Sequence, residues 1–328
     1  MRKSRAHGYG GARRDRTAIS RRDVLKVGAG AAGVALLGGI GYPRPARASE
    51  RTLTLGNIGW DENVALAYLT KVILEDHLDY EHVELRHMGV GDLFHGVASG
   101  QLDGFQDVWL PNTHHTYWRQ YGDQVERLGS WYRGDATLGL TVPDYVEAQS
   151  IDDLARDARR YNGEIVGIEP SAGEMRIVRD KVMPGYGLDD LKLVASDTPS
   201  MLSRLEDALH HARPIVVTLW QPHWAFTVYR IRYLKDPKGL MSSNEGLYSI
   251  VRKGLKADKP DAYAFMNAIS LTPDQLGKLE LAINLASSPA DGVRTWLKQD
   301  RPFGSQRGLN QDLVQPWIDA ARKARSSA

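Results

Sequence analysis

Short apolar runs alternate along this chain with longer segments in which apolar residues recur at helical spacing. The first part of the pattern predicts strands at 52–57, 83–87 and 104–110 and helices at 64–77, 93–99 and 113–121. Strands and helices in alternation are typical of an α/β fold with parallel strands. In such sheets, ligands bind where the carboxyl ends of the strands lead into the following loops.

A second group of elements begins near residue 142. The pattern there predicts strands at 164–168, 193–195 and 215–220, a helix from Gly173 and a helix over 200–211. A strand at 248–251 then leads into three or four C-terminal helices, among them 260–268, 273–286 and 309–322. The last of these is expected to kink or restart at Pro316, because proline interrupts the helical hydrogen bonds.

Two lobes are expected, because the chain passes between the two groups of strands twice. Lobe 1 is predicted to comprise residues 49–141 and 238–328, and lobe 2 residues 142–237. The candidate hinges are 141–145 and 233–237. A cleft between two such lobes closes over a ligand by bending at the hinges. The predicted fold class is therefore α/β, with two lobes and a hinged ligand cleft.

The first 48 residues are predicted to be a signal peptide of the twin-arginine type. They contain Arg21 and Arg22, a weakly apolar stretch at 27–40 with five glycines, and an Ala-Arg-Ala sequence that ends at Ala48. The apolar stretch is too short and too polar to span a membrane. Residues 28–33 match the pattern G-x-G-x-x-G, but a dinucleotide site also needs a preceding strand, so we interpret this match as accidental.

Charge and cysteine content narrow the possible functions. The first 48 residues hold 11 of the 42 Lys and Arg but only two of the 40 Asp and Glu, so residues 49–328 carry a formal net charge of −7. That balance argues against a nucleic-acid partner. The chain has no cysteine, and therefore no disulfide, thiol nucleophile or lipid-anchored cysteine. We expect a free periplasmic protein.

Three tryptophans stand beside polar residues at the ends of predicted strands. They are Trp60, Trp109 and Trp220. Because a quaternary ammonium group has no N–H to donate, it is held mainly by the faces of aromatic rings. Three indole faces brought together from two lobes would form a cage for such a cation. A single tryptophan is more often a packing residue, and we interpret the other five in this way: Trp118, Trp131, Trp224, Trp296 and Trp317.

Two other kinds of site are weaker hypotheses. His114 and His115 are neighbours, but adjacent residues of a helix point in different directions and no third ligand stands at metal-binding spacing. Asp61 and Glu62 diverge in the same way, and no nucleophile motif accompanies them. Their simpler interpretation is negative charge at a helix N-terminus. We therefore expect no metal, no cofactor and no catalytic residues.

Several segments resemble the glycine betaine and proline betaine binding proteins of ABC transporters. The similarity covers nearly all of residues 49–328 and lies in GWDENVA (59–65), WLPNTH (109–114), GLTVP (139–143), GIEPSAG (167–173), WQPHWAF (220–226) and YLKDPK (233–238). The resemblance implies a type II-like periplasmic binding protein, whose closed form docks on a membrane permease with its ATPase. We expect a monomer.

The resemblance also implies roles for individual residues. Trp60, Trp109 and Trp220 would enclose the trimethylammonium group, and His114 would hold the ligand carboxylate together with the backbone amides of Gly173 and Glu174. The pattern from Ser171 to Glu174 is that of a capping box, and free amides at a helix start attract a carboxylate. Four more residues are candidates to line the cleft: Asp61, Glu62, His223 and Trp224.

Other ligands and one other class of protein remain open. Choline has the same cationic group but no carboxylate, so His114 and the amides at Gly173 and Glu174 favour a betaine. Carnitine and proline betaine carry both groups and fit the same features. A secreted enzyme that acts on betaine is the alternative from a different class, although no cofactor loop or nucleophile–base pair follows residue 48.

Overall fold

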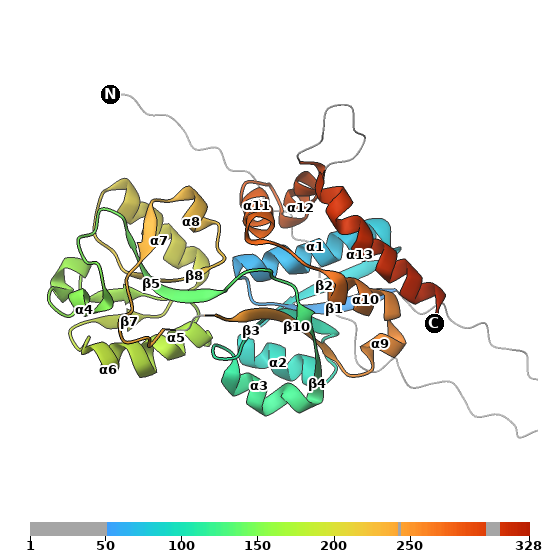
Figure 1. Cartoon of the computed structure of the whole chain (residues 1–328), viewed down its shortest axis with the longest axis horizontal. Coiled ribbons are helices and arrows are strands. Elements are labelled where there is room, and N and C mark those ends of the chain that lie inside the picture. Colours follow the sequence, from blue (N-terminus) through green and yellow to red (C-terminus); the bar gives the residue numbers. More distant parts are fainter. Residues whose placement is uncertain (1–50, 242–243, 300–308) are drawn as a thin grey trace, which may run out of the picture. The chain divides into compact units, whose positions relative to one another are not determined.

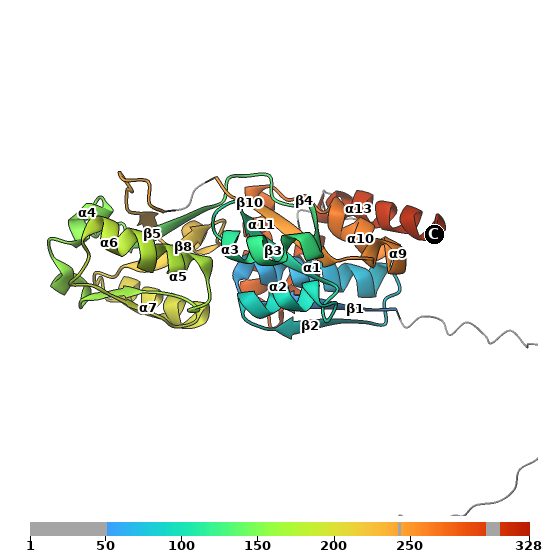
Figure 2. The same ribbon diagram turned by 90° about the horizontal axis from the view of Figure 1, so that it is seen from below.

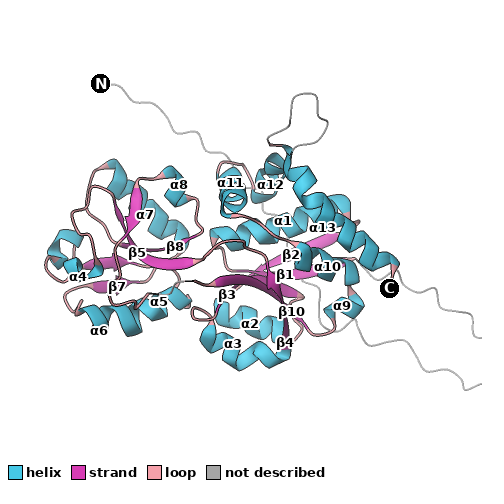
Figure 3. Cartoon of the chain, viewed as in Figure 1, coloured by secondary structure: helices cyan, strands magenta, loops and turns pink. Residues whose placement is uncertain are grey.

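The computed structural model describes residues 51–241, 244–299 and 309–328. The predicted signal peptide lies outside this part of the chain. Ala48–Ala328 forms one compact unit that contains two five-stranded sheets (Figures 1 and 3). The apolar runs of the sequence supply the strands of both sheets, and the amphipathic segments supply the helices that cover them.

The first sheet has the strand order β2-β1-β3-β10-β4. Its strands are β1 (Thr52–Asn57), β2 (His82–His87), β3 (Gly104–Leu110), β4 (Val125–Ser130) and β10 (Gly246–Arg252). β1 pairs in parallel with β2 and β3, as predicted, but β10 runs antiparallel to β3 and β4. β3 is buried along its whole length, including its two polar residues, Gln106 and Asp107.

Helices cover both faces of the first sheet. Early in the chain they are α1 (Asp61–His77), α2 (Val90–Ala98) and α3 (His115–Tyr121). The chain moves from β1 outward to β2 and then back past β1 to β3, and right-handed connections therefore place α1 and α2 on opposite faces. Figure 1 shows α1 on one side of the sheet and α2 with α3 on the other, and Figure 2 views the sheet from the side of α2 and α3.

The C-terminal helices return to the first sheet. They are α9 (Leu255–Asp258), α10 (Pro260–Ala268), α11 (Pro273–Asn284), α12 (Pro289–Lys298) and α13 (Leu309–Ser326). α11 and α12 pack on α1, and α10 packs on α13. The helix α13 continues through Pro316 and extends four residues beyond the predicted end. α11 begins with a capping box in which Thr272 and Gln275 hydrogen-bond each other's backbone amides.

The second sheet has the order β7-β6-β8-β5-β9. Its strands are β5 (Thr137–Pro143), β6 (Glu164–Val166), β7 (Lys192–Val194), β8 (Val217–Gln221) and β9 (Ile231–Tyr233). Its helices are α4 (Ile151–Leu154), α5 (Gly173–Ile177), α6 (Met183–Tyr186), α7 (Thr198–His210) and α8 (Ala225–Val228), with a π-helical turn (Val178–Val182) between α5 and α6. Below, lobe 1 means the first sheet with α1–α3 and α9–α13, and lobe 2 means the second sheet with α4–α8.

The first crossing between the sheets comes earlier than the sequence suggested. The whole of β5 pairs with β8 and β9, so the predicted boundary after Thr141 falls inside a strand of the second sheet. The chain crosses at 131–136 and returns after β9, where the structure describes 234–241 and 244–245. These two crossings are joined by an antiparallel bridge between Ala136 and Glu245. The apolar run over 137–143 was too short for its sheet to be assigned from its pattern alone.

A large side chain in the helical layer of lobe 1 provides a test of the packing. Trp296 on α12 is completely buried. We expect Trp296→Ala to lower the free energy of unfolding by about 3–5 kcal/mol, because it removes buried apolar contacts and leaves a cavity. Urea denaturation measures this change. Leu285→Ala serves as the control, because Leu285 is 77% exposed and its loss should change stability by no more than about 0.5 kcal/mol.

Candidate functional site

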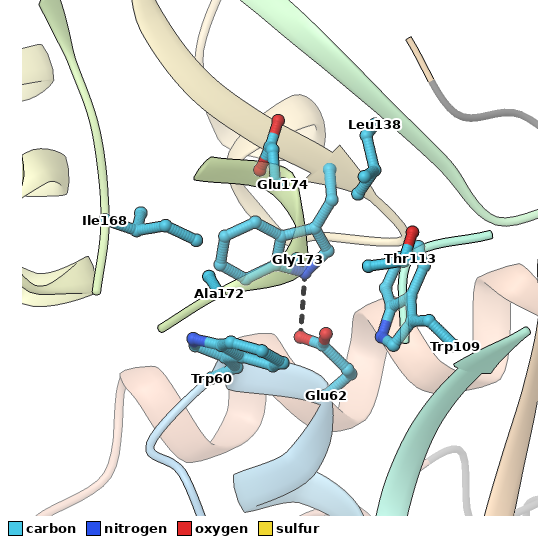
Figure 4. A pocket seen from close by; sticks show the side chains of 10 residues that line it. Trp60, Glu62, Trp109, Thr113, Leu138, Ile168, Ala172, Gly173 and Glu174 are labelled. Atoms are coloured by element: carbon cyan, nitrogen blue, oxygen red, sulfur yellow. Dashed lines mark hydrogen bonds between the residues drawn. The ribbon is translucent and has the colours of Figure 1, made fainter. Parts of the chain in front are cut away.

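A cavity enclosing about 250 Å³ of empty space, including its opening, is lined by residues of both lobes. Its lining consists of Trp60, Glu62, Trp109, Thr113, Leu138, Ile168, Ala172, Gly173, Glu174 and Trp220 (Figure 4). All three tryptophans of the predicted cage are therefore in one cavity. The backbone amides predicted at Gly173 and Glu174 belong to two further lining residues.

The three tryptophans reach the cavity from three separate elements. Trp60 lies between β1 and α1, Trp109 is on β3 and Trp220 is on β8. Their side chains are 4%, 2% and 3% exposed. The ring centroids of Trp60 and Trp220 are 6.2 Å apart and their planes are inclined by 54°. The rings of Trp60 and Trp220 are thus inclined to each other and do not stack.

Two indole N–H groups of the cage are bound by carboxylates of the opposite lobe. Trp60 of lobe 1 donates from Nε1 to Glu169 Oε2 of lobe 2 at 2.9 Å. Trp220 of lobe 2 donates to Glu62 Oε2 of lobe 1 at 2.8 Å. A buried indole N–H usually finds an acceptor, and here each acceptor is a carboxyl oxygen. These reciprocal bonds set the orientation of both rings and join the two lobes at the cavity.

The third indole is oriented from within its own strand. Trp109 donates from Nε1 to Asp107 Oδ1 at 2.9 Å. Residues two apart on a strand point to the same face, so the alternation along β3 brings this carboxyl to the tryptophan. Asp107 stands two positions before the WLPNTH segment, and an acidic residue at this spacing from a predicted cage tryptophan was a signal that the sequence contained.

Three of the four candidate cleft-lining residues form a separate contact between the lobes. Trp224 donates from Nε1 to Asp61 Oδ1 at 2.7 Å, and His223 Nε2 lies 3.0 Å from Asp61 Oδ2. These residues do not line the cavity, whereas Glu62 does. Asp61 and Glu62 point to different lobe 2 partners, as expected of neighbours at a helix start.

His114 packs against Trp60 and is not among the residues that line the cavity. It is fully buried, and its ring stacks on Trp60 with 5.9 Å between the ring centroids. The backbone N–H of Trp109 donates to His114 Nδ1 at 3.1 Å, so the proton of the neutral ring is on Nε2. Burial and the nearby Arg176 lower the pKa of His114 to about 3. Among the described residues, Nε2 has no hydrogen-bond partner.

The start of α5 closes the cavity from lobe 2. The helix begins at Gly173 after Ala172, and no side chain caps it, so the predicted capping box of Ser171 and Glu174 is wrong. The carboxyl of Glu174 is instead buried, and burial raises its pKa well above the usual range. The first amides of a helix have no intrahelical acceptors. Those of Gly173 and Glu174 are therefore free to bind a ligand anion.

Most of the chain matches a known protein family. The family model for the substrate binding domain of ABC-type glycine betaine transport systems matches residues 51–299. The chain belongs to this family. The glycine betaine/carnitine transport binding protein GbuC of Listeria monocytogenes is 36% identical over 191 residues, which are 57% of this chain. The match spans 58% of the Listeria protein's length.

Solved structures in the family share the fold. Lactococcal OpuAC, in a closed conformation complexed with glycine betaine, is 34% identical and has a TM-score of 0.72, covering 81% of this chain and 99% of that one. The glycine betaine and L-proline binding protein ProX of Borrelia burgdorferi is 25% identical with a TM-score of 0.73, covering 82% and 99%. These similarities confirm the predicted two-lobed α/β fold of a periplasmic binding protein.

Some residues of the family site were not predicted from the sequence. Glu169 orients Trp60 and also accepts hydrogen bonds from Thr198. The Glu245 carboxylate accepts from the backbone amides of Asn112 and Thr113, and so positions the loop before His114. Glu169 lies inside the GIEPSAG segment and was within reach of the sequence. Glu245 lies 131 residues beyond His114 along the chain, and only the folded structure brings it to the loop.

Two other kinds of feature are absent from the part of the chain that the structure describes. No group of three His, Asp or Glu side chains there is arranged to hold a metal ion. His115, the neighbour of His114, is exposed on α3. Within the same residues, no helix has both the length and the apolar character needed to cross a membrane.

The close approach of Gly173 to lobe 1 generates a prediction about lobe contact. A Cβ atom at Gly173 would lie 2.4 Å from the backbone oxygen of Thr113. We expect Gly173→Ala to push the lobes apart and to weaken glycine betaine binding about tenfold or more, equivalent to about 1.4 kcal/mol. Calorimetric titration measures the loss. Gly277→Ala is the control, because nothing lies within 4 Å of the added methyl group. Unchanged affinity of the Gly173 variant would show that the close contact between Gly173 and Thr113 is not needed for binding.

Proposed function

We propose that this protein binds glycine betaine, or a related quaternary ammonium zwitterion such as proline betaine, as the substrate-binding protein of an ABC importer. The observation that supports this best is the cavity walled by Trp60, Trp109 and Trp220. Glycine betaine is the ligand in the complex of lactococcal OpuAC, whose sequence is 34% identical. The fold, the family and the chemistry of the cavity therefore favour the same class of ligand.

The cage suits a methylated ammonium group for electrostatic reasons. The indole N–H groups are held by carboxylates, so the ring faces, with their negative quadrupole, are directed to the space between them. A desolvated cation–π contact contributes about 2 kcal/mol. Three such contacts, together with a bound carboxylate, are sufficient for micromolar affinity, which requires about −8 kcal/mol.

The carboxylate of the ligand would be held at the other end of the site. The amides at the start of α5 line the cavity, and His114 Nε2 is a buried donor without a partner among the described residues. Leaving a buried donor unsatisfied costs about 1–3 kcal/mol, and a ligand carboxylate would remove this cost. The low pKa of His114 keeps the ring neutral, with its proton on Nε2, throughout the physiological pH range.

Choline and carnitine are the competing ligands. Choline would fill the tryptophan cage but would leave His114 and the α5 amides without an anion. Carnitine has both charged groups, and the Listeria relative is named for glycine betaine and carnitine. The paired donors therefore favour a zwitterion over choline, and they do not distinguish among zwitterions.

We propose binding without chemical conversion. The cavity is lined by apolar side chains, two carboxyl groups and the hydroxyl of Thr113, which donates to Glu245 Oε1 at 2.6 Å. No serine, lysine or histidine is among the lining residues, and the matching family is one of transport substrate-binding domains. The competing hypothesis is a secreted enzyme that acts on betaine. Recovery of the ligand unchanged after incubation supports a receptor, and its consumption would establish an enzyme.

The physiological role follows from the type of importer. The protein would be exported by the twin-arginine pathway, remain free in the periplasm as a monomer, and deliver its ligand to a permease driven by an ATPase for osmoprotection. The two lobes would close about the crossing at 131–136 and the return after β9. Ligand binding and closure would then be one event, because the cage takes walls from both lobes.

Calorimetric titration with glycine betaine, proline betaine, choline, carnitine and proline tests the proposal. We expect the quaternary ammonium zwitterions, namely glycine betaine, proline betaine and carnitine, to bind and proline, which lacks the N-methyl groups, to bind weakly. Trp220→Ala should reduce glycine betaine affinity about 30-fold, the equivalent of one desolvated cation–π contact. Trp118→Ala, outside the cavity, should have no effect. Equal binding of proline and glycine betaine would contradict a cage for methylated cations.

The proposed carboxylate site has its own test. His114→Ala should weaken glycine betaine about tenfold or more, since it removes a hydrogen bond from a buried donor to a charged group, and should weaken choline much less. Titration of each ligand into the wild-type protein and into each variant gives, for glycine betaine and for choline, the ratio of the variant's dissociation constant to that of the wild type. His115→Ala is the matched control, because this exposed neighbour should leave both affinities unchanged. Equal losses for the two ligands would refute the carboxylate role of His114.

A further inference from the structure

Three buried acidic side chains surround the base of the tryptophan cage. Glu62 lines the cavity from α1, Asp107 comes from β3 and Glu280 comes from α11, and each is at most 1% exposed. Figure 4 shows the Glu62 carboxyl between Trp60 and Trp109. Glu62 and Asp107 already use one oxygen each to accept an indole N–H. Their second oxygens have no donor among the described residues.

No cation compensates these acids within the part of the chain that the structure describes. None of the three forms an ion pair there, although many exposed acids do. The charged groups that face Glu62 are Asp107 and Glu280, and Glu280 in turn faces Asp61. An isolated buried carboxylate is so costly that the group normally takes up a proton instead. Two carboxyl groups in one buried site therefore share a proton.

Glu62 and Asp107 are placed to share that proton. Each carboxyl accepts one indole N–H of the cage, and the negative charge of Asp107 acts on Glu62. A hydrogen bond between two carboxyl groups requires a proton on one of them, and it would use the two oxygens that lack donors. Burial and the negative charges of Asp107 and Glu280 hold the pKa of Glu62 well above its usual range. Burial raises the pKa of Asp107 to about 8.

We propose that the Glu62–Asp107 pair releases a proton to solvent when the quaternary ammonium group of the ligand enters the cage. This inference rests on the proposed function and adds a charge-compensating pair to it. The ligand nitrogen has a fixed positive charge and no proton to give. Its entry replaces the shared proton as the positive charge beside the two carboxyl groups. The site exchanges one positive charge for another, and the pair becomes a dicarboxylate.

The exchange affects both specificity and pH dependence. A neutral group of the same shape would leave the proton in place and would gain only the contacts with the rings. Because the bound cation lowers the pKa of the pair, binding releases a proton, and affinity for glycine betaine must rise with pH over the range in which the free pair keeps its proton. A cage that acts through ring faces alone has no group that titrates in this range.

Calorimetry in buffers with different ionisation enthalpies counts the released protons directly. Glycine betaine is titrated into the full protein at pH 7 in phosphate and in Tris, and the observed heats are compared. We expect release of about half a proton or more per ligand. Glu62→Gln retains an acceptor for the Trp220 N–H and should reduce the count, and Glu62→Gln combined with Asp107→Asn should reduce it to near zero.

A buried acid elsewhere in lobe 1 serves as the control. Asp261 accepts hydrogen bonds from Arg51 and Tyr80 and does not line the cavity, so Asp261→Asn should retain the wild-type proton count. Glycine betaine binding with equal heats in all buffers would overturn the proton exchange and leave the proposed function intact. A loss of proton release in the Asp261 variant equal to that in the Glu62 variant would also overturn it. Absence of binding would overturn the proposed function itself.

Discussion

The site depends on hydrogen bonds between indole N–H groups and buried carboxylates. The three tryptophans of the cage are buried to a few per cent exposure, and each donates its N–H to an acidic side chain: Glu169, Asp107 or Glu62. Each bond fixes the edge of a ring and thereby the direction of its face. The ring faces form walls of the cavity because the N–H edges of the rings are hydrogen-bonded to these acidic side chains. If an apolar residue replaced any of these carboxylates, the corresponding ring would lose the hydrogen bond that orients it, and its N–H would have no acceptor.

The same bonds connect the cage to the contact between the lobes. Trp60 and Trp220 each reach across to an acid of the opposite lobe, and Trp224 does the same beside them through Asp61. At the crossings, Glu245 pairs with Ala136 through the backbone and holds the loop before His114 through its carboxylate. Glu245 thus connects the carboxylate end of the proposed site to the segment about which the lobes would move.

Burial of several acidic side chains opposes folding. Their positions in the structure indicate what function each group of acids has. Glu62, Asp107 and Glu280 gather at the cage, where a ligand cation would compensate them, while Asp103 and Asp261 are buried beside arginine or lysine partners. Uncompensated buried carboxyl groups are stable only when protonated or when a positive charge is supplied. A binding protein can accept that cost because its ligand provides the charge and stabilises the folded state by mass action.

The sequence by itself determined the α/β pattern, the two lobes, the family and the residues from which the cage is built. Strand and helix periodicity is local, and the motifs that carry the tryptophans are contiguous, so both can be read from neighbouring residues. The assignment of β5 to the second sheet, the antiparallel direction of β10 and the uncapped start of α5 depend on pairing across long chain separations. The partners of the indole N–H groups of Trp60 and Trp220 are more than 100 residues away along the chain. Only the tertiary structure could show that the acids of α1 and β3 meet beneath the cage, because their proximity results from the packing of a helix on a sheet and not from any pattern within either element.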